Sequence, residues 1–76
     1  MQENKEAITL ALLEAYRLTR EDITGMEYGR DEYGSERVRV YVGDGDERRL
    51  WLDVNVNCDS SCTLIHDVAK AVNAAI

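Results

Sequence analysis

Basic residues are scarce in this chain of 76 residues, because nine lysines and arginines stand against fifteen aspartates and glutamates and give a net charge of −6. A domain that binds a nucleic-acid backbone needs a basic footprint, so this balance argues against direct nucleic-acid binding. Proline and phenylalanine are absent, so aliphatic side chains must build most of the core. The longest uninterrupted apolar run, residues 10–13, is far too short to span a membrane.

Cysteine and histidine are nearly as scarce. The two cysteines, Cys58 and Cys62, and the one histidine, His66, are spaced four residues apart, and these are ligand types that zinc prefers. A structural zinc site needs a fourth ligand, which the chain does not offer, so we expect no metal and no cofactor. A metal- or thiol-dependent regulatory protein built on these residues is an alternative. The N-terminal sequence lacks a secretory pattern, and two thiols in such a chain predict a cytoplasmic setting.

Two rows of apolar residues at strict two-residue spacing dominate the middle of the chain. They are Val38, Val40 and Val42 in the first row and Leu50, Leu52, Val54 and Val56 in the second. Such alternation predicts two antiparallel strands that share one apolar face, joined by the turn-forming residues 43–46.

The register of this hairpin follows from burial. The two apolar rows face each other only where partner residue numbers sum to 92, which requires an odd-length loop or a β-bulge. This register predicts that Tyr41 lies opposite Trp51 and that Arg39 lies opposite Asp53.

The first part of the chain shows helical periodicity. Apolar residues at Ile8, Leu12 and Tyr16 predict an amphipathic helix over residues 3–17. A capping pattern that begins at Thr19 predicts a short helical turn over residues 20–24. In that pattern Leu18 and Ile23 form a hydrophobic staple, and Gly25 ends the turn. Residues 26–29 predict a short further strand.

A final helix is predicted from an N-cap at Asp59 or Ser60 to the C-terminus. The expected core stripe of this helix is Ile65, Val68, Ala69, Val72 and Ile76, flanked by Leu64 and Ala75.

These elements predict one α+β domain over residues 1–76. It is a two-layer sandwich of an N-terminal helix, an antiparallel meander of two or three strands and a C-terminal helix. The order resembles that of double-stranded-RNA-binding domains. The resemblance implies a topology only, because residues 59–62 read Asp-Ser-Ser-Cys where those domains place basic residues.

The polar face of the hairpin is the best candidate for function. Tyrosine, tryptophan and arginine dominate interface hot spots, and this face is not needed for the core. The expected partner-binding residues are Arg39, Tyr41, Arg49, Trp51 and Asp53. We therefore expect a small, acidic, non-enzymatic module that binds another protein as an inhibitor or adaptor, and a homodimer is a further expectation.

The segment 21–36 suggests a second binding surface, because it carries six acids against Arg30 alone. Its expected acidic patch is Glu27, Asp31, Glu32 and Glu36. An alternative function is therefore a nucleic-acid mimic that presents carboxylates to the basic cleft of a DNA- or RNA-binding enzyme, as phage anti-defence proteins do. No catalytic constellation is visible, so we expect that the protein is not an enzyme.

Overall fold

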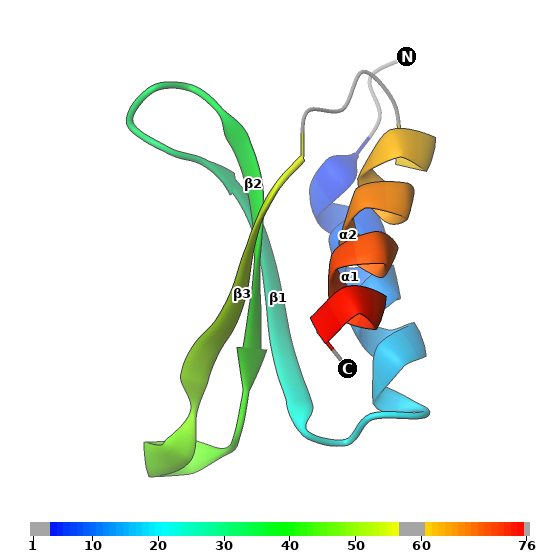
Figure 1. Cartoon of the computed structure of the whole chain (residues 1–76), viewed down its shortest axis with the longest axis vertical. Coiled ribbons are helices and arrows are strands. Elements are labelled where there is room, and N and C mark those ends of the chain that lie inside the picture. The colour runs from blue at the N-terminus through cyan, green and yellow to red at the C-terminus, as the bar shows by residue number, and fades with distance from the viewer. Residues whose placement is uncertain (1–3, 57–60, 76) are drawn as a thin grey trace.

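The computed structural model describes residues 4–56 and 61–75 of the chain. In chain order the elements are α1 (Lys5–Arg17), β1 (Ile23–Arg30), β2 (Glu36–Val42), the 3-10 turn η1 (Gly45–Glu47), β3 (Arg49–Asn55) and α2 (Ser61–Ala75). The strands form one antiparallel sheet in the order β1-β2-β3, and both helices lie on the same side of it (Figure 1). The predicted α+β sandwich is confirmed, with three strands in the meander. No helix within the described ranges is long and apolar enough to cross a membrane.

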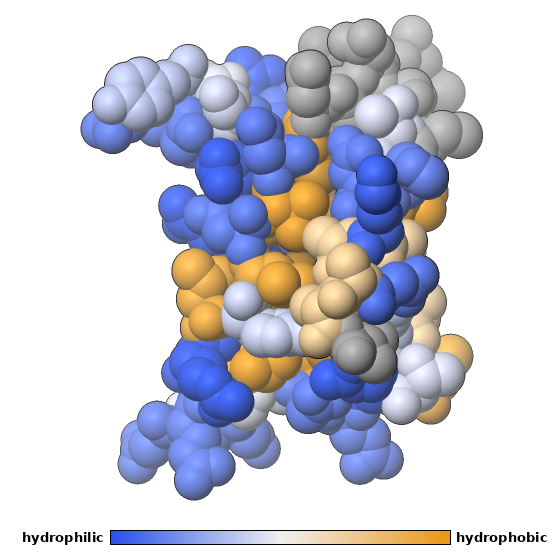
Figure 2. Space-filling view, in the orientation of Figure 1, coloured by the Kyte–Doolittle hydropathy of each residue, from blue (hydrophilic) through white to orange (hydrophobic). Residues whose placement is uncertain are grey.

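The core lies between the sheet and the two helices. Apolar side chains are visible between these layers in Figure 2, while hydrophilic ones gather at the lower end and at the upper left of the view. Burying this aliphatic surface is the main favourable contribution to folding. The buried core residues are Ile23, Met26, Val38, Val40, Val42, Val56, Leu64, Val68 and Val72.

Helix α1 begins at a cap that the sequence analysis did not identify. The Asn4 side chain accepts a hydrogen bond from the Ala7 backbone N–H, which satisfies one of the free donors of the first turn. Thr9 is buried on the inner face of α1, and its hydroxyl donates to the Lys5 carbonyl, so burial leaves this polar group paired. The apolar residues of α1 that pack against the core are Ile8, Leu12, Leu13 and Tyr16.

The predicted helical turn over residues 20–24 is wrong. Strand β1 already begins at Ile23, which pairs with Val42 and is fully buried. Leu18 is 87% exposed and cannot form the expected staple, and the Thr19 hydroxyl donates to the Tyr16 carbonyl as α1 ends. Tertiary burial of Ile23 in the sheet outweighs the local capping pattern.

The predicted core stripe of α2 is confirmed at Val68 and Val72, but Leu64 takes the buried place that was expected of Ile65. Leu64, Val68 and Val72 are fully buried at i, i+4 and i+8, whereas Ile65 is 41% exposed. The expected cap and the last residue of the stripe, Ile76, lie outside the described residues.

The predicted register holds in one half of the β2–β3 hairpin. Val38 pairs with Val54, Val40 pairs with Leu52, and Arg39 pairs with Asp53. A bulge follows Val40, as the sequence analysis allowed.

Beyond the bulge, the predicted pairing of Tyr41 with Trp51 is wrong, because Tyr41 pairs with Leu50. Leu50 is consequently 48% exposed, while Trp51 packs against the core. The bulge therefore exchanges the roles of these two residues, since one extra residue moves each following side chain to the other face.

Candidate functional site

The surface of the sheet away from the helices, here called the open face, carries the candidate site. Val38, Val40 and Val42 point to the helices, so the residues that alternate with them in β2 occupy the opposite side. Within the described chain, neither helix covers this side (Figure 1). By register, the open face consists of Gly25, Glu27 and Gly29 from β1, Arg37, Arg39 and Tyr41 from β2, and Leu50, Asp53 and Asn55 from β3.

The two arginines in the middle of the open face differ in their engagement. Asp53 lies 2.7 Å from Arg37, measured from Oδ1 to Nε, but 4.0 Å from Arg39, measured from Oδ2 to Nε. A second carboxylate, that of Asp31, lies 3.8 Å from Arg37. Register alone therefore does not decide the ion pair, because Asp53 opposes Arg39 but binds Arg37 more closely. The Arg39 side chain is half exposed and makes one long ion-pair contact.

Tyr41 and Arg48 form a stacked pair beside Arg39. The Arg48 guanidinium lies 4.4 Å from the centre of the Tyr41 ring, which is favourable cation–π geometry. Gly25 permits this arrangement, since a Cβ there would lie only 2.5 Å from Arg48 Nη2. Leu50 adds exposed apolar surface opposite Tyr41. We call Arg39, Tyr41, Arg48 and Leu50 the open-face patch.

Two of the predicted partner-binding residues do not belong to this patch. Trp51 packs against the core, and the Arg20 guanidinium lies 5.4 Å from its ring centre. Arg49 pairs with Val42, whose side chain faces the helices, so register places Arg49 on that side.

The bulge and the loop explain what the sequence analysis missed. Leu50 replaces Trp51 on the open face because of the bulge, and Arg48 joins it from the loop that contains η1. The only sequence signal for the bulge is the burial argument, which requires either an odd-length loop or a bulge in the hairpin and does not give the position of a bulge.

The structure divides the predicted acidic patch among three places. Glu27 lies on the open face, where its carboxylate accepts a long hydrogen bond of 3.4 Å from the Tyr41 hydroxyl. Asp31 shapes the β1–β2 turn, because Oδ1 accepts backbone N–H groups two and four residues onward. Glu32 is exposed in that turn, whereas Glu36 points to the helix side. The four acids therefore do not form one continuous surface.

Glu36 belongs to a polar network at the edge of the core. Its Oε1 lies 2.7 Å from Lys5 Nζ and also accepts a hydrogen bond from the Tyr28 hydroxyl. Arg30 lies farther away, at 3.7 Å from the same oxygen. Burial, together with the hydrogen bond to Glu36, raises the pKa of Tyr28 above its ordinary value of 10.0. This network stabilises the fold. It holds the Glu36 carboxylate on the helix side of the sheet, away from the open face.

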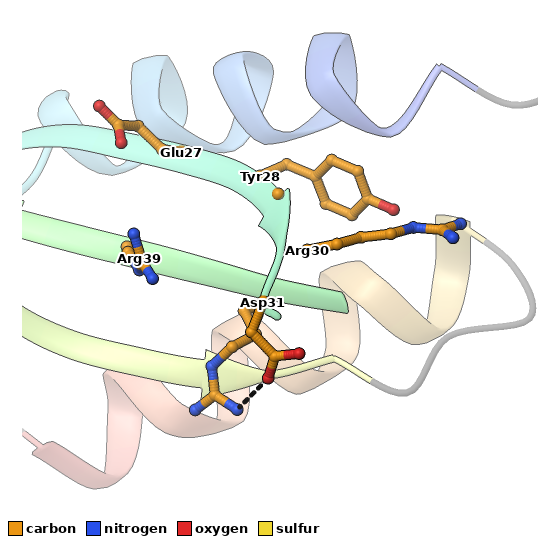
Figure 3. Close-up of a pocket in the computed structure, with 7 residues that line it drawn as sticks. Glu27, Tyr28, Arg30, Asp31 and Arg39 are labelled. Atoms are coloured by element: carbon orange, nitrogen blue, oxygen red, sulfur yellow. Dashed lines mark ion pairs between the residues drawn. The ribbon is translucent and has the colours of Figure 1, made fainter. Parts of the chain in front are cut away.

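A small hollow of about 70 Å³ adjoins Arg39 on the open face (Figure 3). Glu27, Gly29 and Asp31 contribute to its lining, and a Cβ built on Gly29 would meet nothing within 4 Å. Figure 3 draws no ion pair between Glu27 and Arg39, although β1 and β2 align these two residues. Arg37 also lines the hollow, and its guanidinium lies 3.8 Å from the Asp31 carboxylate, so part of the charge around the hollow is already paired.

No protein-family model, no curated protein and no solved structure matches this chain.

The cysteine–histidine candidate lies mostly outside the described residues. This applies to Cys58 and to the side chain of Cys62, while His66 is exposed on α2. Among the side chains that the structure describes, no three of the His, Cys, Asp and Glu residues are grouped so that they could hold a metal ion.

Proposed function

We propose that the protein is a small non-enzymatic module that binds a partner protein through the open-face patch, as an inhibitor or an adaptor in the cytoplasm. One observation carries the proposal: both helices lie on one side of the sheet, and a half-exposed leucine lies on the other side beside a stacked tyrosine and arginine. Tyrosine and arginine are enriched among residues that dominate binding energy. The residues that would carry binding are Arg39, Tyr41, Arg48 and Leu50, with Asp53 at their margin.

The nucleic-acid-mimic alternative has less support. A mimic needs carboxylates arranged along one surface, and the acids of segment 21–36 are divided between the open face, a turn and the helix side. The carboxylate of Asp22 is paired with Arg20 at 2.6 Å, and this pairing lowers the pKa of Asp22. Asp22, Asp31 and Glu36 therefore act as local structural partners.

Affinity capture from the native cell tests the proposal. The wild-type protein, the double variant Arg39→Gln/Tyr41→Ser and the control variant Lys70→Gln would be immobilised in parallel, because Lys70 is exposed on α2, far from the open face in the fold. We expect a partner that the wild type and the control retain equally and that the double variant loses at least about tenfold, which is typical of removing hot-spot contacts.

Two results would contradict the proposal. One is a captured protein that the double variant retains as strongly as the wild type. The other is a partner that is displaced when a basic DNA-binding protein is added as a competitor, and whose capture requires Asp31 and Glu32. That result would support the nucleic-acid mimic. Circular dichroism of each variant must first show that the α+β fold is preserved.

A further inference from the structure

The open-face patch offers a cation and an apolar surface in a fixed order along β2. Arg39 and Tyr41 are two residues apart and project from the same side of the strand. Alternate residues of an extended chain are separated by about 6.8 Å. An extended segment that lies along β2 can therefore place one side chain at Arg39 and its second neighbour over Tyr41 and Leu50.

The charge at the first of these positions is positive. Arg39 has a side chain that is 49% exposed, and its ion pair with Asp53 is a long contact of 4.0 Å because Arg37 holds that carboxylate at 2.7 Å. A guanidinium of this kind has donors in a planar fork that match a carboxylate. The adjoining hollow leaves space for such a group beside Gly29, and its lining also contains Arg37 and the carboxylates of Glu27 and Asp31.

We propose that the open face recognises an extended segment of another protein that carries an acidic side chain and, two residues away, an aliphatic or aromatic side chain. The carboxylate pairs with Arg39, and the apolar side chain covers Leu50 and the Tyr41–Arg48 stack. This inference rests on the proposed function and names the chemistry of its partner.

A second copy of the chain fits the open face poorly in the arrangement that is centred on Arg39. A twofold axis that lies between two such faces and passes near Arg39 sets this arginine against its own copy. The flanking strands then bring acids together, because Glu27 and Asp53 lie on either side of Arg39. Like charges opposed in an interface are strongly unfavourable, and each chain also carries a net charge of −6.

Glu27 allows a second test of the proposal, in which the expected effect on binding is opposite to that of Arg39. Its carboxylate lines the hollow beside Arg39, so it repels an incoming acid while Arg39 attracts it. Arg39→Gln is therefore expected to weaken binding, whereas Glu27→Gln is expected to strengthen it. A merely hydrophobic contact on this face would respond to neither change in this pattern.

The test uses the full isotope-labelled chain and blocked synthetic heptapeptides with the central motifs Glu-Thr-Leu and Leu-Thr-Glu. Matched controls replace Glu by Gln or Lys, or Leu by Ser. We expect at least one acidic peptide to shift the amide resonances of Arg39 and Tyr41, with a Kd of about 0.1–1 mM, as befits a short flexible ligand. The Gln peptide should bind at least about fivefold more weakly, since it loses the charge-assisted pair.

Variants of the protein complete the test. Arg39→Gln should lose the preference for Glu over Gln, Glu27→Gln should tighten binding of the acidic peptide about two- to fivefold, and Lys70→Gln on α2 should change nothing. Equal or tighter binding of the Lys peptide, shifts confined to other surfaces, or no shift at about 5 mM peptide would overturn the inference. Because the capture experiment does not depend on these peptides, such a failure would be distinguishable from failure of the proposed function.

Discussion

The two faces of the sheet differ in what their side chains do. On the helix side, Val38 and Val40 are fully buried against the core. On the open side, the residues that alternate with them are Arg37, which is ion-paired with Asp53, Arg39, which has one long ion-pair contact, and Tyr41, which is stacked with Arg48. A strand of seven residues thus serves stability with one set of positions and leaves the other set available for binding. Substitutions that place the same chemical change on each face test this division.

The largest contrast is expected between two leucines. Leu64 is fully buried in α2, and Leu50 is half exposed on the open face. Leu64→Ala should lower the free energy of unfolding by about 2–5 kcal/mol, which approaches the roughly 3–5 kcal/mol available to a domain of this size. Leu50→Ala should cost less than about 1 kcal/mol. Urea unfolding followed by the fluorescence of Trp51 measures both.

A milder core substitution is needed in case Leu64→Ala unfolds the protein completely. Ile23→Val, at a fully buried position of β1, should cost about 0.5–1.5 kcal/mol and remain measurable. If Leu50→Ala proved as damaging as Leu64→Ala, the open face would be part of a core, and its role as a binding surface would be untenable.

The sequence was sufficient to predict which valines face the helices, because alternation in β2 is uninterrupted from Val38 to Val42. The same rule fails in β3, where the bulge beside Trp51 shifts the alternation by one residue. Nothing local marks this position, since Leu50 and Trp51 are both good strand residues. A bulge near Thr24 also hides the pairing of Ile23 from periodicity.

The candidate site was predictable in part for a similar reason. The pairing of Arg39 with Asp53 and the open-face position of Tyr41 follow from register. The stacking of Arg48 does not, because it depends on the path of a loop and on the missing side chain of Gly25. Side chains contributed by loops are set by tertiary contacts that the pattern of a strand does not contain.

Two tyrosines on opposite faces provide the next contrast. The Tyr28 hydroxyl donates to Glu36 within the polar network, whereas the Tyr41 hydroxyl makes only a 3.4 Å contact with exposed Glu27. Tyr28→Phe should therefore cost about 1–2 kcal/mol of unfolding free energy, and Tyr41→Phe less than about 0.5 kcal/mol. Equal losses in urea unfolding at pH 7 would mean that the two faces are equally involved in stability.

Alkaline pH provides a further test of the contrast between Tyr28 and Tyr41. The folded state raises the pKa of Tyr28 above 10.0, so its contribution is complete below pH 10 and is lost as the pH rises through the folded pKa. The stability difference between the wild type and Tyr28→Phe should therefore shrink between pH 8 and pH 11. The corresponding difference for Tyr41→Phe serves as the control, and a Tyr28 difference that grew with pH would contradict the assignment.

The smallest expected effects concern two glycines on the open face. A Cβ at Gly29 meets nothing within 4 Å, so Gly29→Ala should stabilise the protein by about 0.5 kcal/mol through reduced freedom of the unfolded chain. At Gly25 the same Cβ would lie 2.5 Å from Arg48 Nη2, so the guanidinium must shift from its position over Tyr41. Gly25→Ala should therefore not give this stabilisation, and it should also weaken partner binding. Urea unfolding of both variants measures their free energies of unfolding. A gain at Gly25 as large as that at Gly29 would show that the Arg48 stack contributes nothing to the folded state.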